Sequence, residues 1–395
     1  MDKLPKGWES SIVDDVAIRI HYGYTGKTIE NGEYKYLRIT DIQNSAVEWE
    51  QVPFVSIVDK EVKKYLLNEN DIVFARTGAT AGKSFLITSL NVKSVFASYL
   101  IRIIPDLYKI YPRFLYQYFQ SPEYWSYITL NVEGAAQPNF NGKKLANIPI
   151  PLPSLPEQKR IVSKLDALFE RIDKSMALLE ENIKHTESLM ASALDEVFTI
   201  TSRRVSISEL IEKTKNINPK QNPNQEFTYI DITSINNKTH IIEDPKFLIG
   251  DDAPSRARKG VEYGDILFAT TRPNLRNIAV INKSYKNPVA STGFCVLRVK
   301  KGVNSDFVFN CLLSNEIQKQ ITPFIRGAQY PAISDKNLTS CKVPALEFKE
   351  QNAIAEKIKL LRDKAIKLQE EQQDKLNNLK ALKESILDKA FKGQI

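Results

Sequence analysis

The segment Thr77-Gly-Ala-Thr-Ala-Gly-Lys-Ser84 has the residue types of a phosphate-binding loop, in which backbone N–H groups and a lysine surround the phosphates of a nucleotide. Its spacing does not fit, because three residues separate Gly78 from Gly82-Lys83-Ser84 where the pattern needs four. The residues that follow, Phe85–Thr88, predict a strand instead of a helix whose N-terminus would face a phosphate. We therefore predict no nucleotide site here.

Other catalytic patterns are also missing from the sequence. There is no Asn/Asp-Pro-Pro-aromatic tetrapeptide, no glycine-rich cofactor loop after a first strand, and no acidic cluster that recurs along the chain. The histidines are His21, His185 and His240, and none is placed as an obvious general base. We expect a chain with no catalytic residue, no metal site and no cofactor of its own.

Three pairs of predicted loops instead carry side chains of the kind that bind nucleic acids. They are Arg76–Lys83 with Thr270–Arg276, Gly134–Lys143 with Arg326–Lys336, and Arg19–Lys27 with Lys213–Gln225. Arginine can bind guanine through two hydrogen bonds, and Asn or Gln can do the same with adenine, each pair discriminating by ~1–3 kcal/mol. Lysines and backbone amides would contact phosphates and fix the register. The candidate DNA-binding residues are Arg19, Tyr22, Tyr24, Lys27, Arg76, Thr77, Lys83, Gln137, Asn139, Asn141, Lys143, Lys220, Gln221, Arg272, Asn274, Arg276, Arg326, Gln329 and Tyr330.

A purely structural role is the alternative for each of these loops. Gly134 and Gly327 would equally serve a backbone with positive φ. Gln137 and Gln329 would equally cap nearby backbone groups.

The elements that position these loops are duplicated, since the second half of the chain repeats the first at a shift of 193 residues. Gly134-Ala135-x-x-Pro138 returns as Gly327-Ala328-x-x-Pro331, and Glu157-Gln158 returns as Glu350-Gln351. Such a period is far too long for a solenoid repeat. It indicates two copies of a whole domain with its following helix, so a ligand of one copy should have a counterpart on the other.

Each copy has the pattern of a mixed α/β (α+β) domain followed by a long helix. Short β-branched and aromatic runs predict strands in both copies, for example at Asp71–Ala75 and Asp265–Thr270. The predicted organisation is a first mixed α/β domain at 1–153, a central helix at 154–200, a second mixed α/β domain at 201–346 and a C-terminal helix at 347–395.

The two predicted helices have matching apolar stripes. No Gly or Pro interrupts Glu157–Phe198, and Gly393 lies where a C-terminal cap belongs. One such helix cannot bury its stripe alone, so we expect the two to pair as an antiparallel coiled coil, in preference to an exposed linker helix. The apolar positions that remain, expected to dock another subunit, are Phe169, Leu178, Phe198 and Phe391.

Composition limits the class of protein further. The 395 residues are 42% hydrophobic with a net charge of +8, which favours a folded protein with a polyanionic partner. No apolar run approaches the ~20 residues of a membrane span, and the N-terminus lacks the apolar core of a signal peptide. The cysteines Cys295, Cys311 and Cys341 all lie in the second copy, so we expect no shared disulfide framework and a cytoplasmic location.

Together these residues resemble the specificity subunit of type I restriction–modification systems. The likeness extends over the whole chain: it includes Leu4-Pro-Lys-Gly-Trp8, the Gly-Ala-Ala-Gln-Pro138 segment, the proline-rich run Ile148–Gln158 and Leu382–Phe391. The second copy departs from the pattern, because Cys341-Lys-Val-Pro-Ala-Leu replaces the proline ladder and Gln329 lies one place earlier than Gln137.

The resemblance implies a non-catalytic subunit whose two target recognition domains each read half of a split DNA sequence. The paired helices would space the half-sites, and two methyltransferase subunits would dock there and bring S-adenosylmethionine to adenine N6. A restriction and translocation subunit using ATP and Mg²⁺ would join for restriction. Because the two copies differ in sequence, the double-stranded DNA target should be asymmetric.

Two other classes remain as alternatives. One is a two-headed adaptor that binds protein partners without contacting DNA, against which the basic loops argue. The other is a fused methyltransferase, which the missing cofactor and catalytic motifs disfavour.

Overall fold

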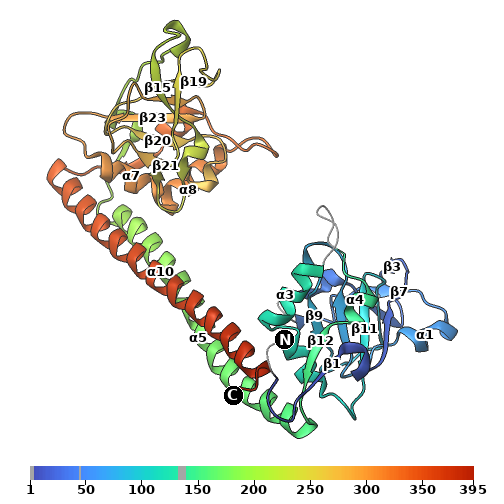
Figure 1. Cartoon of the computed structure of the whole chain (residues 1–395). Coiled ribbons are helices and arrows are strands. Elements are labelled where there is room, and N and C mark those ends of the chain that lie inside the picture. The colour runs from blue at the N-terminus through green and yellow to red at the C-terminus, as the bar shows by residue number, and fades with distance from the viewer. Residues whose placement is uncertain (1–3, 44–45, 132–138) are drawn as a thin grey trace. The chain divides into compact units, whose positions relative to one another are not determined.

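The structure is a computed structural model that describes residues 4–43, 46–131 and 139–395 (Figure 1). The chain forms two compact units, one of Met1–Leu179 with Asp374–Ile395 and the other of Glu180–Gln373. Each unit contains one mixed α/β domain, part of the long helix that follows it and part of the other long helix.

In the first unit, strand order β2-β11-β8-β9 forms one four-stranded sheet and β10-β4-β7-β3 another, with two-stranded sheets β1-β12 and β5-β6. The strands are β1 (Glu9–Ile12), β2 (Ala17–Tyr22), β3 (Thr28–Ile29), β4 (Tyr34–Leu37), β5 (Ile42–Gln43), β6 (Ala46–Val47), β7 (Phe54–Val55), β8 (Ile72–Ala75), β9 (Ser84–Leu86), β10 (Ser94–Phe96), β11 (Leu100–Pro105) and β12 (Pro149–Leu152). The shorter helices are α1 (Asp59–Tyr65), α2 (Pro112–Tyr118), α3 (Pro122–Asn131) and α4 (Gly142–Ala146).

The second unit has sheets of the same sizes, β14-β23-β20-β21, β18-β15-β22-β19, β13-β24 and β16-β17. The strands are β13 (Arg204–Ser206), β14 (Ile211–Glu212), β15 (Glu226–Ile230), β16 (Ile235–Asn236), β17 (Ile241–Ile242), β18 (Lys246–Ile249), β19 (Ala257–Gly260), β20 (Ile266–Ala269), β21 (Ile278–Val280), β22 (Val289–Ser291), β23 (Phe294–Val299) and β24 (Lys342–Pro344). The shorter helices are α6 (Ile207–Leu210), α7 (Ser305–Leu313), α8 (Asn315–Ile321) and α9 (Asp335–Thr339).

The central strands β8 and β20 explain why each domain has two layers of core. All four residues of β8 are buried, and alternate side chains of a strand point to opposite faces. Ile72 and Phe74 accordingly join the cluster that contains α2, whereas Val73 and Ala75 join the cluster beneath the second sheet. The residues of β20 divide between two clusters in the same way. A continuous apolar run is therefore required at this position in both copies.

The proline-rich run before the first long helix includes an edge strand. Pro149–Leu152 is strand β12, paired antiparallel with β1 so that Glu9 faces Leu152. Prolines two residues apart direct their missing N–H groups to the same side, and an edge strand tolerates this. The shorter β24 pairs with β13 in the equivalent place, Arg204 facing Pro344.

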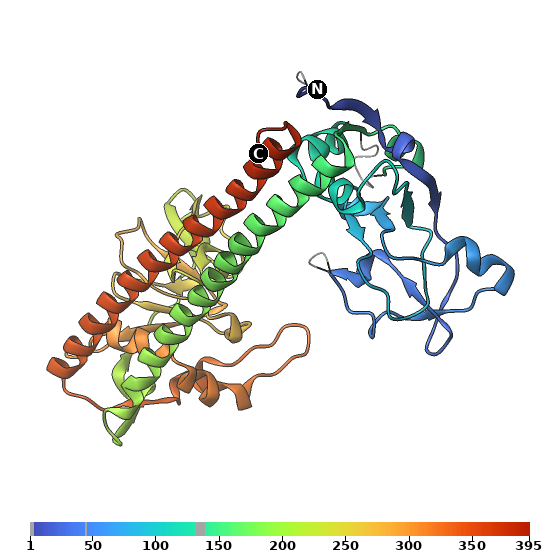
Figure 2. The ribbon, with the colours of Figure 1, turned by 90° about the horizontal axis from the view of Figure 1, so that it is seen from below.

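The long helices are α5 (Leu155–Glu196, 42 residues) and α10 (Phe348–Phe391, 44 residues). They lie side by side and antiparallel (Figures 1 and 2), as the paired apolar stripes predict. In the first unit Ile161 and Leu165 of α5 share a core cluster with Leu387 of α10, and Lys383 Nζ lies 2.7 Å from Asp173 Oδ1. In the second unit Leu194 shares a cluster with Ile358. Among the described residues, no helix has the length and apolar character needed to cross a membrane.

The structure corrects the predicted docking surface on these helices. Phe169, Phe198 and Phe391 are 7%, 7% and 2% exposed, because each packs into a core cluster of its own unit. The ring centroid of Phe391 lies 5.2 Å from those of Phe114 and Tyr118. Of the four, only Leu178 is exposed, at 52%.

Candidate nucleic-acid interface

In the first unit, the three predicted loop regions meet at the end of the β2-β11-β8-β9 sheet. Arg76 follows β8, and its guanidinium carbon lies 4.9 Å from the ring centroid of Tyr22, the last residue of β2. The Tyr22 hydroxyl accepts a hydrogen bond from the Gly142 N–H at 2.8 Å. The carbonyl of Arg76 accepts one from the Phe140 N–H at 2.8 Å. Residues distant in sequence are thus fixed around one arginine.

Tyr99 belongs to the same group, although the sequence prediction missed it. Its carbonyl accepts the N–H of Arg76 at 3.2 Å, and its side chain is 62% exposed. The only signal in the sequence is a large aromatic residue in the short connection between β10 and β11. We call Tyr22, Arg76, Tyr99 and Asn139 the Arg76 cluster.

The equivalent loop of the second unit holds Arg272. The Thr270 carbonyl accepts the Ile333 N–H at 3.0 Å, and Ile333 lies one repeat of 193 residues after Phe140. Arg272 donates its N–H to the Pro331 carbonyl at 2.6 Å, and its guanidinium carbon lies 5.4 Å from the Tyr330 ring centroid. We call Thr271, Arg272, Arg326 and Tyr330 the Arg272 cluster.

A groove of about 1130 Å³ adjoins the Arg272 cluster. Arg272 and Tyr330 line it together with Asn236, Lys238 and Arg256. The loop prediction did not include these last three residues, which lie away from the repeated loops: Asn236 ends β16, Lys238 lies in the β16–β17 turn and Arg256 precedes β19. The turn itself is held in place, since Asn237 Nδ2 donates to the Leu275 carbonyl at 3.1 Å.

Some predicted residues have structural roles that the sequence did not distinguish from ligand contacts. Arg276 donates to the Leu313 carbonyl at 3.1 Å and to Asn315 Oδ1 at 2.6 Å. Asn141 caps α4, accepting the Lys144 N–H at 2.9 Å. The Tyr24 ring packs 5.4 Å from that of Tyr65. The side-chain contacts of these three residues hold the fold together.

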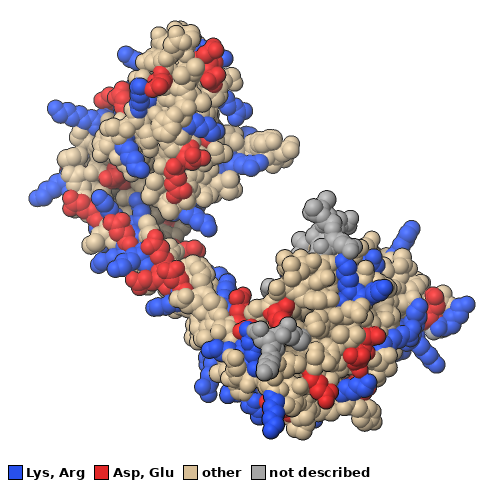
Figure 3. Space-filling model, in the orientation of Figure 1, with Lys and Arg blue, Asp and Glu red and all other residues tan. Residues whose placement is uncertain are grey.

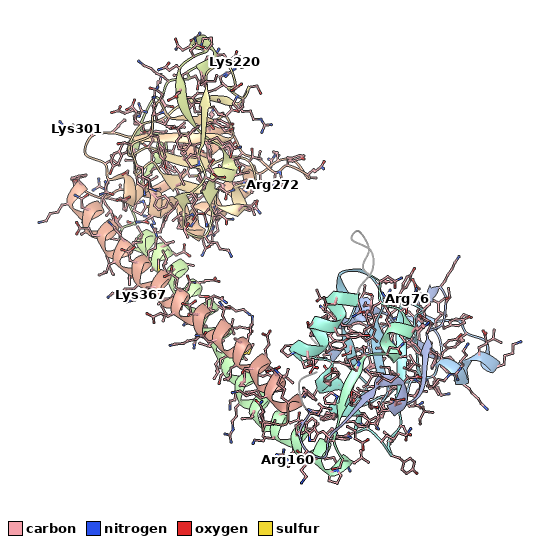
Figure 4. The ribbon with its side chains drawn as sticks, in the orientation of Figure 1. Arg76, Arg160, Lys220, Arg272, Lys301 and Lys367 are labelled. Atoms are coloured by element: carbon pink, nitrogen blue, oxygen red, sulfur yellow. The ribbon has the colours of Figure 1, made fainter. Side chains whose placement is uncertain are left out.

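Lys220 and Gln221 are not brought to the Arg272 cluster. They lie in the 3-10 turn η5 (Pro219–Gln221), and Gln221 lines a separate groove of about 820 Å³ with Lys213, Asn216 and Arg258. In Figure 4, Lys220 lies at one end of the second unit and Arg272 on its side. The loop Arg19–Lys27 therefore lies beside the other two loops of the first copy, whereas its counterpart Lys213–Gln225 lies apart from the other two loops of the second copy.

The remaining candidates are mostly surface side chains. Thr77 is half-buried and pairs with Asn139 through an isolated backbone bridge. Arg326 is exposed, but its guanidinium folds back onto the Pro323 carbonyl at 2.8 Å. Gln137 lies outside the described residues. The exposed candidates are Arg19, Lys27, Lys83, Asn139, Lys143, Asn274, Gln329 and Tyr330.

The segment Thr77–Ser84, whose residue types resemble a phosphate-binding loop, does not have the geometry of one. The 3-10 turn η3 (Gly78–Thr80) leads into strand β9, so no helix begins beside Lys83. Within the described residues, no three His, Cys, Asp or Glu side chains are placed to hold a metal ion. Figure 3 shows basic and acidic side chains interspersed over the visible face of each unit. The two loop clusters are thus defined by specific side chains and not by a single basic face.

The fold is duplicated, and each copy presents one loop cluster. The same backbone hydrogen bond holds both clusters, but their side chains differ, which is the arrangement of a protein with two recognition domains. The family model for the type I restriction modification DNA specificity domain matches residues 5–184 and again residues 187–378. The chain belongs to this family, as a type I specificity subunit with two target recognition domains.

Curated relatives have similar lengths and modest identity. The chain is 24% identical to the type I restriction enzyme MjaVIII specificity subunit of Methanocaldococcus jannaschii, over 96% of this chain and 91% of that protein. It is 24% identical to the StySPI specificity subunit of Salmonella potsdam, over 100% and 90%.

Solved structures show the same fold. A chain from a study of complex assembly and conformational transition of the type I restriction–modification system matches with a TM-score of 0.79 and 22% identity, over all of both chains. The HsdS subunit from Thermoanaerobacter tengcongensis matches with a TM-score of 0.57 and 21% identity, over 100% and 98%.

Proposed function

We propose that this chain selects the DNA target of a type I restriction–modification complex and catalyses no step itself. Each recognition domain reads one half of a split double-stranded sequence. The observation that carries the proposal is the repeated anchor of the loop clusters: the same backbone bond holds the segment after β8 to Phe140 and the segment after β20 to Ile333. The side chains on that common anchor differ, so the two half-sites differ and the target is asymmetric.

The paired helices set the distance between the half-sites. A helix of 42 residues is about 63 Å long at ~1.5 Å per residue, which exceeds one DNA turn of ~34 Å. Two methyltransferase subunits dock on the helical regions, where Leu178 is exposed. They supply S-adenosylmethionine and methylate an adenine that leaves the base stack. A restriction and translocation subunit with ATP and Mg²⁺ completes the complex.

Methylation mapping by long-read sequencing tests this proposal. DNA is taken from cells that express the chain with its methyltransferase subunit, and from cells that express the methyltransferase subunit alone. A split, asymmetric, adenine-methylated motif that requires the chain supports the proposal. With an active methyltransferase and no motif, the chain is a protein-binding adaptor, and the absence of a sequence-specific, salt-dependent affinity for DNA would corroborate this.

A further inference from the structure

We propose that Arg76 and Arg272 each read a guanine, one in each half-site, from a guanidinium held by stacking on a tyrosine. This inference rests on the proposed function and adds the base and the residue that recognises it. Both units contain an arginine stacked on a tyrosine, although the residues that form the two stacks do not correspond to each other in the repeat.

The two arginines occupy different places in the equivalent loops. β8 and β20 end at Ala75 and Ala269, so Arg76 corresponds to Thr270, whereas Arg272 corresponds to Gly78. Their tyrosines also differ in origin, since Tyr22 ends β2 and Tyr330 lies in the Arg326–Lys336 loop. Each unit thus has an arginine stacked on a tyrosine beside the shared backbone hydrogen bond, and the two stacks are formed from residues at different positions of the repeat.

Each guanidinium is restrained from several directions. A cation over an aromatic face is attracted by the ring, at guanidinium-to-centroid distances of 4.9 Å for Arg76 and 5.4 Å for Arg272. Tyr22 is fixed by the Gly142 N–H, and the Arg272 backbone is fixed by the Pro331 carbonyl. Such restraint lowers the side-chain entropy lost when a ligand binds.

The donors of these arginines remain available. Within residues 4–43, 46–131 and 139–395, neither guanidinium makes a hydrogen bond or an ion pair with another side chain or carbonyl. Nε of Arg76 is buried without a hydrogen-bond partner, which leaves its two terminal nitrogens as the donors for a ligand. Two parallel N–H donors match O6 and N7 of guanine, which both accept in the major groove. Arg276 differs in this respect, because its nitrogens are already bonded to Leu313 and Asn315.

Arg272, like Arg276, also has a strained backbone that fixes where its side chain begins. Its φ of 51° lies in the left-handed region, where a residue with a side chain is disfavoured. Strained backbone conformations cluster at binding sites, and here the conformation is held by the Pro331 carbonyl. Gly78 occupies the corresponding place in the first copy, where it has a φ of 75°. As a glycine, it has no side chain that this conformation could orient.

The test uses the complete methyltransferase complex and compares Arg272→Ala, Arg272→Lys, Arg76→Ala and Arg76→Lys with the parent chain. Lysine keeps the charge but cannot make the paired donor geometry. Lys301→Ala and Lys60→Ala, at exposed positions away from the loops, are the matched controls. We expect each arginine variant to relax the methylated motif at one guanine in its own half-site and to leave the other half unchanged.

The second step replaces that guanine by 7-deazaguanine, which keeps base pairing and removes N7. Binding by the parent complex should weaken by about 5-fold, the low end of the range for a complete paired contact, because O6 still accepts one hydrogen bond, while the alanine variant should show no further loss. Tyr330→Ala should weaken discrimination at the guanine read by Arg272, and Tyr330→Phe should preserve it.

The outcomes separate the two proposals. A split motif whose guanines survive all four arginine substitutions overturns this inference and leaves the proposed function standing. A motif that requires the arginines but is insensitive to 7-deazaguanine also overturns it, by assigning them to phosphates. Absence of any chain-dependent motif overturns both.

Discussion

Gln158 and Gln351, one repeat apart, attach the two long helices to their domains through the same hydrogen bonds. Gln158 accepts the Tyr111 N–H at 2.7 Å and donates to the Pro153 carbonyl at 2.8 Å. Gln351 accepts the Asn304 N–H at 2.9 Å and donates to the Leu346 carbonyl at 2.8 Å. Both side chains are buried, at 0% and 5% exposure. The glutamines therefore fix each helix to the start of α2 or α7, which explains why the Glu-Gln pair recurs in the sequence.

Replacing Gln158 by leucine should destabilise the first unit by about 2–6 kcal/mol, because it strands the Tyr111 N–H and the Pro153 carbonyl at about 1–3 kcal/mol each. Trp8, Trp49 and Trp125 all lie in the first unit, so tryptophan fluorescence during urea unfolding reports on it directly. Gln351→Leu should instead shift the transition followed by circular dichroism. The exposed neighbour Lys159 provides the control variant Lys159→Leu. An unchanged fluorescence midpoint in Gln158→Leu would show that these bonds contribute little.

Phe391 should contribute to the stability of a domain at the opposite end of the sequence. Its side chain is 2% exposed among Phe114 and Tyr118, so Phe391→Ala should lower the stability of the first unit by about 3–5 kcal/mol. The measurement is again the tryptophan-fluorescence midpoint. Phe198→Ala, its repeat equivalent, should act on the second unit. Leu178→Ala, at 52% exposure, should change stability by under about 0.5 kcal/mol. Equal effects of Phe391→Ala and Leu178→Ala would contradict the packing described here.

The sequence predicts the repeat, the central strands and the paired helices because these depend on periodic burial. β8 and β20 are short apolar runs between turns, and the helices carry unbroken apolar stripes. It could not distinguish Arg272 from Arg276, which flank the same turn with nearly identical φ angles of 51° and 52°. Only the tertiary position of Leu313 and Asn315 makes Arg276 structural. Residue type predicts which side chains are able to bind a base, and packing decides which remain free to do so.

Burial also predicts how stability depends on pH. Burial first, and then the charge of nearby Arg362, lowers the pKa of His240 from 6.5 to about 4. Burial first, and then Arg102 and Arg19, lowers the pKa of His21 to about 4 as well. A base with a depressed pKa in the folded state binds fewer protons there than when unfolded. Its stabilising contribution is therefore complete above pH 6.5 and is lost as the pH falls towards 4.

The variant His240→Asn should flatten this part of the profile for the second unit. Asparagine tolerates the φ of 58° at this position and does not titrate. The unfolding free energy is measured between pH 7 and 4 for the parent, for His240→Asn and for His185→Asn, whose exposed imidazole provides the control. If the parent profile is as flat as that of His240→Asn between pH 6.5 and 4, the titration of His240 does not contribute to the pH dependence of stability.

Arg276 should affect stability and leave the DNA motif unchanged, in contrast to Arg272. It ties the turn after β20 to Asn315, which in turn is bonded to Asp195 at the end of α5 at 2.8 Å. Arg276→Ala should cost about 1–3 kcal/mol, since it strands the polar groups that the guanidinium satisfies. Arg276→Gly should cost about 1 kcal/mol less than alanine, because glycine relieves the left-handed backbone. Asn274→Ala, at an exposed position, should leave the melting temperature unchanged.

Both properties can be measured on the same variants. Melting temperatures are determined by calorimetry, and methylation is mapped at a temperature where each variant stays folded. Arg276→Ala should then give a lower melting temperature with the parent motif, whereas Arg272→Ala should give the parent melting temperature with a relaxed motif. A relaxed motif in Arg276→Ala, with its stability intact, would place Arg276 among the recognition residues and overturn the assignment made from its hydrogen bonds.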